Sequence, residues 1–170
     1  FSAGMLMYYD RAGDSKFNPT QFSPSISYHF LPQKNSNSFI SIAFQPGYSQ
    51  RSLQYDGLNF DSQFDGFMFD PELSSQEEHG NYSIFYPDFG AGIHYLKFLN
   101  NTDYFSGGLA LFHINRPYIS MKELNDVRLS QKITFNVSGS FLKFERKIIP
   151  SIYYAKQGVH TEFLFGARAS

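Results

Sequence analysis

The side chains best suited to chemistry lie in one long stretch, residues 49–82, which is rich in carboxylates. Hard cations such as Ca²⁺ bind several oxygen ligands, so this stretch is a candidate calcium site. Its spacing fits no EF-hand, and an acidic loop that is simply solvated explains the same composition. The sequence alone therefore leaves a bound metal unknown. The carboxylates belong to Asp56, Asp61, Asp65, Asp70, Glu72, Glu77 and Glu78.

Large apolar side chains are interspersed with these carboxylates, which argues against a disordered loop. Exposed apolar side chains need a partner, either the mouth of the fold that carries the loop or another protein. A plug that merely closes that mouth is the alternative to a docking surface. Asp65, Asp70 and Asp88 are candidates for ion ligands or for caps of the loop's turns. The predicted partner-binding residues are Phe60, Phe64, Phe67, Phe69, Asp65 and Asp70.

No arrangement of residues predicts catalysis, so we expect no enzyme and no cofactor. The five histidines form no metal-binding pattern, and there is no Gly-x-Ser-x-Gly elbow. Gly90-Ala91-Gly92 lacks the third glycine and the helix of a nucleotide fingerprint. His29 and His94 are interpreted as hydrogen-bonded residues of a polar face, and His113 as part of a turn. A net charge of −1 gives no electrostatic case for nucleic acid.

The elements that position these residues are strands, because apolar and polar side chains alternate with a period of two. Phe and Tyr together with frequent Gly also favour strands and turns. The alternation is strictest in residues 21–30, 38–48 and 131–141. Five more segments follow it less strictly, which gives eight predicted strands. These five segments are residues 1–9, 83–96, 104–113, 148–155 and 161–169.

The composition of the two strand faces predicts a membrane barrel. No charged residue falls on any of the eight apolar faces, whereas the opposite faces carry mostly Ser, Gly, Asn, Gln and Thr. Phe-rich faces that end in Tyr suit lipid, and small polar residues suit a lumen. A soluble β-sandwich, with its apolar face inside, is the alternative. The chain has no cysteine, which excludes a disulfide scaffold, and no apolar run of about 18 residues for a transmembrane helix.

The connections between the predicted strands alternate in length. The first, third and fifth are long, and the second, fourth and sixth are short, as in an up-and-down barrel with extended external loops. The seventh is short and breaks the alternation. We therefore predict that residues 1–170 are part of one antiparallel transmembrane β-barrel domain, a fragment with further strands at both ends. In chain order the connections are residues 10–20, 31–38, 49–82, 97–103, 114–131, 143–147 and 156–160.

Five short motifs in residues 10–120 carry a family resemblance. The chain resembles the PorP/SprF family of type IX secretion outer-membrane proteins. Beyond residue 120 only the strand alternation continues. The motifs are Asp10-Arg11-Ala12-Gly13-Asp14, Leu53 with Leu58-Asn59-Phe60, Phe69-Asp70-Pro71, Pro87-Asp88-Phe89-Gly90-Ala91-Gly92 and His113-Ile114-Asn115-Arg116-Pro117.

The resemblance implies a barrel in the outer membrane of a Gram-negative bacterium that takes part in secretion, in surface anchoring of adhesins and, in gliding species, in motility. The implied partners are a secreted adhesin or other cargo with a sorting domain, further type IX secretion components and outer-membrane lipid. No catalytic residues carry over from the family. A porin-like channel, or another outer-membrane barrel without a secretion role such as a lipid-acting enzyme, is the rival interpretation. A porin would place more charged residues on the lumen faces than this sequence has.

Overall fold

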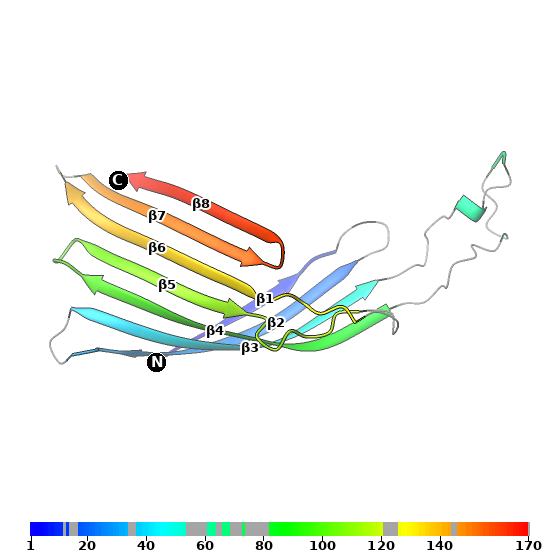
Figure 1. Cartoon of the computed structure of the whole chain (residues 1–170), viewed down its shortest axis with the longest axis horizontal. Helices are drawn as coiled ribbons and strands as arrows, with labels where there is room; N and C mark the ends of the chain where they lie inside the picture. Colours follow the sequence, from blue (N-terminus) through cyan, green and yellow to red (C-terminus); the bar gives the residue numbers. More distant parts are fainter. Residues whose placement is uncertain are drawn as a thin grey trace.

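The computed structural model describes residues 1–11, 13, 17–33, 37–53, 61–63, 66–68, 73, 82–120, 126–143 and 146–169. Within these ranges the chain forms one sheet of eight antiparallel strands in sequence order, and no α-helix (Figure 1). No helix among the described residues is long and apolar enough to cross a membrane. The elements are β1 (Ser2–Tyr9), β2 (Asn18–Phe30), β3 (Ser38–Leu53), the 3₁₀ turn η1 (Asp61–Gln63), β4 (Tyr82–Phe98), β5 (Tyr104–Phe112), β6 (Lys132–Lys143), β7 (Arg146–Gln157) and β8 (His160–Ala169).

The sheet is a single curved layer. Figure 1 shows it curling, with β1 and β2 passing behind β4. β1 and β8 are the edge strands of the sheet. The described residues of β1 pair only with β2, and those of β8 pair only with β7. An open, curved, all-antiparallel meander is the architecture of part of a barrel wall, which confirms the predicted fold class.

The register places all the predicted apolar faces on one side, which we call the outer face. Because the side-chain period is two, a slip of one residue in any ladder would move a strand's apolar set to the other side. The observed pairing contains no such slip. One row across seven strands consists of Tyr28, Ile42, Ile93, Leu109, Phe135, Tyr154 and Phe163.

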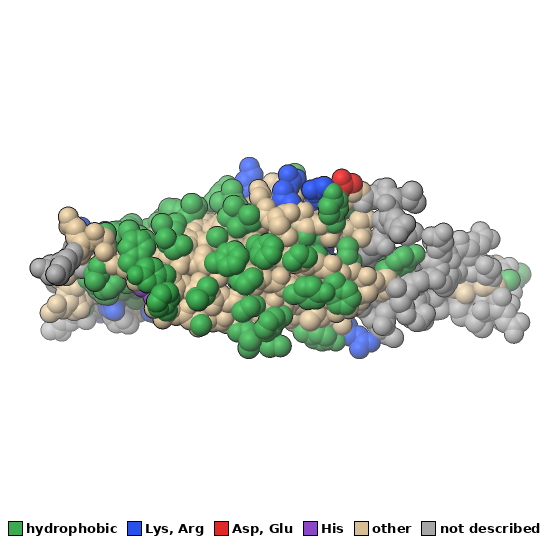
Figure 2. Space-filling view, turned by 90° about the horizontal axis from the view of Figure 1, so that it is seen from below, with side chains coloured by type: hydrophobic (Ala, Val, Ile, Leu, Met, Phe, Trp, Pro, Cys, Tyr) green, Lys and Arg blue, Asp and Glu red, His purple; other side chains and the backbone are tan. Residues whose placement is uncertain are grey.

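Burial in this sheet is inverted relative to a soluble protein. The outer-face side chains of Ile42, Phe85 and Leu109 are each about half exposed, and Figure 2 shows hydrophobic side chains spread over one side of the molecule. Among the described residues the buried apolar side chains are those of Tyr86, Ala155 and Pro117. The buried polar residues belong to the opposite face or the strand ends and are Ser23, Ser38, Ser49, Asp88, Ser106 and Ser140. A single layer with its apolar side uncovered is what a lipid-facing wall requires, and a soluble sandwich is not observed.

The opposite side, which we call the inner face, is held by hydrogen bonds between small polar side chains. His29 bridges three strands, since its Nε2 atom lies 2.8 Å from Ser2 Oγ and its Nδ1 atom lies 2.7 Å from Ser41 Oγ. Ser106 Oγ and Ser138 Oγ are 2.8 Å apart between β5 and β6. The interpretation of His29 as a hydrogen-bonded polar-face residue is therefore confirmed.

The prolines within strands interrupt the ladders without shifting them. The β2–β3 ladder has a gap between Phe22 and Ile26, where Pro24 faces Pro46 of β3, and it resumes in the same register. A proline cannot donate to a ladder, so placing two opposite each other confines the loss to one gap. The β6–β7 ladder has a similar gap at Pro150.

The connections lie at two ends of the sheet, as the alternating lengths predicted (Figure 1). β3 extends to Leu53 and β4 begins at Tyr82, so the longest connection is 54–81 rather than 49–82. The additional pairing is supported by Gln50, whose Nε2 donates to Ser83 Oγ at 3.0 Å. The seventh connection, Gly158-Val159, is a two-residue hairpin loop in which Gly158 takes a φ of 56°. A two-residue hairpin needs no longer loop, so this connection is short although it lies at the same end as the long ones.

At the other end, the turn between β4 and β5 is tied to β6 by one carboxylate. Asp103 Oδ1 accepts a hydrogen bond from the backbone N–H of Leu142 at 2.7 Å, and Asp103 Oδ2 accepts one from the Asn100 amide at 2.9 Å. The Leu142 hydrogen bond, followed by that of Asn100, lowers the pKa of Asp103. The Asp103 carboxylate therefore stays ionised into acidic conditions. Its contribution to the stability of the fold is lost only as the pH falls through the lowered pKa.

The first prediction tests the two faces with a matched pair of substitutions in β3. Ile42→Arg puts a charge on the outer face and should destabilise the protein in a bilayer by about 2–4 kcal/mol near the midplane. Ser41→Arg, one residue away on the inner face, should be tolerated much better. The folded fraction in lipid vesicles, measured by gel mobility across a urea titration, compares the two. Equal losses for both variants would contradict the assignment of the faces.

Candidate functional site

The turn that follows β5 builds the most elaborate polar cluster among the described residues. The chain reverses at His113 and Arg116, which take φ values of 57° and 45°, and the N–H of Arg116 donates to the carbonyl of His113 at 3.0 Å. Positive φ is uncommon for residues other than glycine, so surrounding contacts must hold this turn. Pro117 follows and stops any return to the β4 ladder.

Asn115 continues the β4–β5 pairing beyond the end of β5, with its side-chain amide taking the place of a strand backbone. Its Nδ2 donates to the carbonyl of Pro87 at 2.7 Å, and its Oδ1 accepts from the N–H of Phe89 at 3.3 Å. The N–H of Ile114 adds a bond to the carbonyl of Phe89 at 3.0 Å. These bonds pair the backbone N–H and C=O groups of β4 where β5 no longer reaches them. Pro87, which has no N–H to donate, takes part only through its carbonyl.

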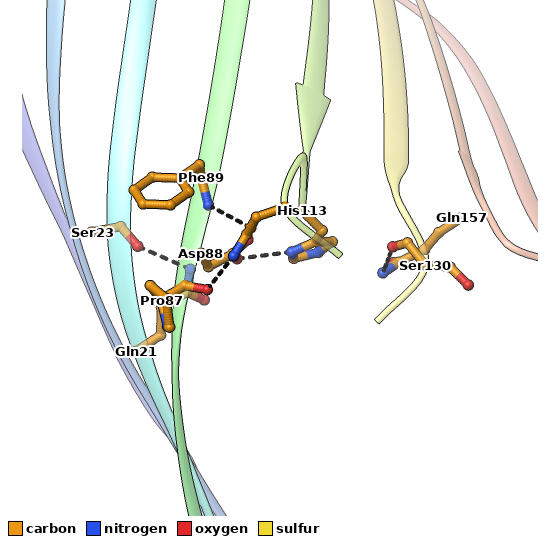
Figure 3. A network of polar contacts seen from close by, with 9 residues as sticks. Gln21, Ser23, Pro87, Asp88, Phe89, His113, Ser130 and Gln157 are labelled. Carbon is orange, nitrogen blue, oxygen red and sulfur yellow. Dashed lines mark hydrogen bonds and ion pairs between the residues drawn. The ribbon is translucent and has the colours of Figure 1, made fainter. Parts of the chain in front are cut away.

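Between these bonds lies an ionisable pair, Asp88 of β4 and His113 (Figure 3). His113 Nδ1 is 2.8 Å from Asp88 Oδ2. Asp88 is only 7% exposed, and its Oδ1 atom has no hydrogen-bond partner among the described residues. A buried carboxylate oxygen without a donor costs free energy, so Oδ1 is an unsatisfied acceptor beneath the surface of the site.

Asp88 faces two adjoining cavities on the inner face, of about 350 Å³ and about 230 Å³. Both are lined by Gln21, Asp88 and His113. The smaller one is also lined by Tyr8 of β1 and Gln157 of β7, although five strands separate β1 from β7. The inner face is therefore the concave side of the sheet, and the cavities lie within that trough.

Part of the connection between β5 and β6 covers the trough. Leu129 lines the smaller cavity. The carbonyl of its neighbour Ser130 accepts from Gln157 Nε2 at 3.1 Å (Figure 3), and Gln131 Nε2 donates to the carbonyl of Ile114 at 3.1 Å. The predicted loop 114–131 thus has fixed ends that return to the sheet.

The same connection contains a small hairpin. The N–H of Ile119 donates to the carbonyl of Val127, and the N–H of Leu129 donates to the carbonyl of Pro117, both at 2.9 Å. The guanidinium of Arg128 lies 4.0 Å from the ring centroid of Tyr118 and donates to its hydroxyl. Stacking of this kind contributes about 0.5–1 kcal/mol at exposed sites. It rigidifies the part of the connection that stands next to the cavities.

Side chains of both signs of charge line the cavities. Among the described residues, His113 is the one that pairs with Asp88. Arg51 lines the smaller cavity, with its guanidinium 5.9 Å from the ring centroid of Tyr86, and Lys132 lines the larger one. Neither forms a salt bridge with Asp88. Within the described ranges no three His, Asp or Glu side chains are grouped to hold a metal ion. The polar groups that line the cavities are suited to hydrogen bonding.

The predicted partner-binding residues fall mostly outside the described part of the chain. Phe67 is described and is 98% exposed. Of the seven carboxylates in the 49–82 stretch, only Asp61 is described, in η1, and the other six lie outside the described residues. Asp88, the further candidate ion ligand, is described and pairs with His113. The remaining partner-binding residues, Phe60, Phe64, Phe69, Asp65 and Asp70, also lie outside the described residues.

The sequence singled out Asp88, but as a turn cap or ion ligand, and it did not anticipate the contact with His113. Both residues belonged to short motifs, Pro87–Gly92 and His113–Pro117, that were treated separately. The pairing of β4 with β5 brings the motifs together. An antiparallel register centred on the turn at residues 99–103 would have been the signal to join them.

Comparisons with known proteins identify a family for the whole chain. The family described as "Type IX secretion system membrane protein PorP/SprF" matches residues 1–169. No curated protein and no solved structure gave a match.

The second prediction concerns the side chain that continues the sheet. Asn115→Ala removes both bonds to β4 and should loosen residues 113–120, at a cost of about 1 kcal/mol for each bond lost. Amide hydrogen exchange should become faster at Phe89 and Ile114. Asn101→Ala, at an exposed position in the turn at the other end, is the control. Unchanged protection at Phe89 in the Asn115 variant would contradict the assigned role.

Proposed function

Because the chain belongs to the PorP/SprF family of type IX secretion system membrane proteins, we propose that it works in the outer membrane of a Gram-negative bacterium, binding or anchoring secreted adhesins at the cell surface. Its partners are then the adhesin or other sorting-domain cargo and further components of the secretion machinery. Family membership carries this proposal, and the inverted burial of the sheet supports a location in lipid. In gliding species the same anchoring serves motility.

Apolar side chains at one end of the sheet support a docking role. Phe67 and Met68 of the longest connection are 98% and 67% exposed. Tyr118 and Val127 of the small hairpin are also exposed. Both connections leave the sheet at the same end (Figure 1). The smaller cavity is lined by Arg51, near the end of β3, and by Leu129 of the β5–β6 connection. Exposed aromatic side chains on one end of a membrane protein favour contact with another protein over solvation.

A porin-like channel is less well supported. An open pore needs a clear inner face, whereas Leu129 and Ser130 cross toward β7 and cover part of the trough. The two cations that line the cavities, Arg51 and Lys132, come from different strands and do not form a ring at a constriction.

The third prediction concerns orientation. The chain has no cysteine, so single introduced cysteines report their own position. Phe67→Cys and Val159→Cys, at the end with the longest connection, should react on intact cells with a reagent that cannot cross the outer membrane. Asn101→Cys, in a turn at the other end, should react only after lysis. Labelling of Asn101→Cys on intact cells would reverse the orientation.

The fourth prediction tests docking through the longest connection. The double variant Phe67→Ser with Met68→Ser removes the two most exposed apolar side chains described there. The amount of adhesin displayed on the cell surface should fall several-fold, as expected when central apolar anchors are truncated, while the level of the barrel in the membrane stays unchanged. Flow cytometry with an antibody to the adhesin measures display.

The matched control for this experiment is Val159→Ser. Val159 is 91% exposed and lies at the same end, but in the short β7–β8 hairpin. It should leave display unchanged. If replacing residues 60–80 with a short Gly-Ser linker also leaves adhesin display intact, the longest connection is not the docking surface.

A further inference from the structure

Charge on the outer face of the eight described strands is restricted to cations. The outer-face register positions hold four lysine or arginine residues and no carboxylate, whereas the two carboxylates of these strands, Asp88 and Glu162, occupy inner-face positions. All four cations lie near strand ends, beyond the charge-free apolar band. Three are at the end with the short turns and one is at the other end. The four are Lys97, Lys143, Arg146 and Lys156.

Two cations at the short-turn end, Lys97 of β4 and Arg146 of β7, are exposed, and neither forms a salt bridge within the described part of the chain. Asp103, a carboxylate of the nearby turn, is already engaged by Asn100 and by the N–H of Leu142. When an apolar face lies in lipid, cations at its end meet the headgroup layer, where phosphate is the anion. The charge at this end therefore favours a partner that carries phosphate.

An apolar groove of about 170 Å³ lies on the outer face beside these cations. It forms where Gly139 offers no side chain and larger groups stand around it. The ring of Phe141 leans over this glycine, since a Cβ atom there would lie 2.8 Å from Phe141 Cε2. Two serines complete the lining, and their hydroxyls bond elsewhere in the sheet. The outer-face residues of the groove are Phe105, Val137, Gly139, Phe141, Pro150 and Ile152.

The strand register joins the groove to the two cations. Lys97 faces Phe105 across the β4–β5 ladder. Arg146 pairs with Lys143, which makes it the diagonal neighbour of Phe141 across the β6–β7 ladder. Side chains at direct and diagonal positions have Cβ atoms about 5–8 Å apart, so both cations adjoin the groove at its end nearest the short turns. An apolar channel that ends at cations matches an acyl chain joined to a phosphate headgroup.

We propose that the outer face binds an anionic phospholipid between β4 and β7, with part of an acyl chain in the groove and the headgroup phosphate at Lys97 and Arg146. Charge-assisted hydrogen bonds from lysine and arginine to phosphate oxygens hold the headgroup. A lipid with net negative charge is preferred, because the ammonium of a zwitterionic headgroup offsets the same phosphate. This inference rests on the membrane location proposed above and adds to it a defined lipid partner.

The test uses the purified full-length protein in an uncharged polyoxyethylene detergent, which does not compete for the cations. Phosphatidylglycerol and phosphatidylcholine with identical acyl chains are added in equal amounts, and native mass spectrometry counts the lipids bound. We expect about fivefold or more phosphatidylglycerol than phosphatidylcholine on the protein, since one cation near a charged lipid headgroup contributes on that order. The preference should shrink as the salt concentration rises.

The double variant Lys97→Gln with Arg146→Gln should bring the ratio of the two bound lipids close to one. Lys97→Arg with Arg146→Lys keeps both charges and should retain the preference. Lys156→Gln, which removes the outer-face cation at the other end, is the matched control and should also retain it. Gel mobility confirms that each variant is folded.

A second pair of variants tests the groove. Val137→Trp fills it and should reduce the amount of phosphatidylglycerol retained by the protein several-fold. Ile133→Trp adds the same side chain to the outer face of the same strand, but outside the groove, and should not.

Three outcomes would overturn the proposal. One is equal binding of the two lipids by the unaltered protein. Another is a preference that survives the Lys97→Gln and Arg146→Gln double variant, because the headgroup would then lie elsewhere. The last is stronger binding of lipid A than of phosphatidylglycerol, which would make a different lipid the occupant. Solubility without detergent is measured in parallel. A protein that needs no detergent contradicts the membrane location itself, whereas one that needs detergent but shows no lipid preference contradicts only this site.

Discussion

The registration of eight successive antiparallel ladders is the constraint on which this structure depends. Each ladder must keep apolar side chains on one side, because one slipped strand would turn its polar residues toward lipid and break the inner-face hydrogen bonds. Pro24 and Pro46 face each other across the β2–β3 ladder and remove two backbone donors there. The ladder nevertheless resumes in the same register on the other side of the gap. Inner-face contacts such as His29 with Ser41 require the same register.

This constraint leaves the molecule with little apolar burial of its own. Serine is the most frequent residue type among the buried positions that the structure describes, so packing inside the trough contributes through hydrogen bonds more than through apolar area. Favourable transfer of the outer face then requires apolar surroundings, as a lipid-facing wall of a membrane β-barrel would have. An uncompensated acceptor on the inner face is then a significant cost, and the half-satisfied Asp88 stands out against the paired serines and His29 for that reason.

The sequence predicted the fold because alternation and register follow from the same period of two. It placed all eight strands, and it erred where alternation stops carrying information: Ser49–Leu53 lacks apolar alternation, yet it pairs with Tyr82–Tyr86. The Asp88 site was beyond such reasoning. It depends on positive φ at His113 and Arg116 and on a side chain, Asn115, acting as a strand, and neither leaves a periodic signal.

The early end of β5 explains why the cavities and the longest connection lie at one end. β4 pairs with β3 over its whole length but with β5 only from Ala91 onward, so the hairpin of β3 and β4 projects beyond its neighbour. The gap beside β4 is filled by the turn from His113, whose bonds also hold the next connection against the trough. A longer β5 would pair the exposed backbone groups of β4 directly. The turn that brings His113 to Asp88 would then not form at this position. The shortened strand therefore creates both the projecting hairpin that carries residues 54–81 and the polar site at its base.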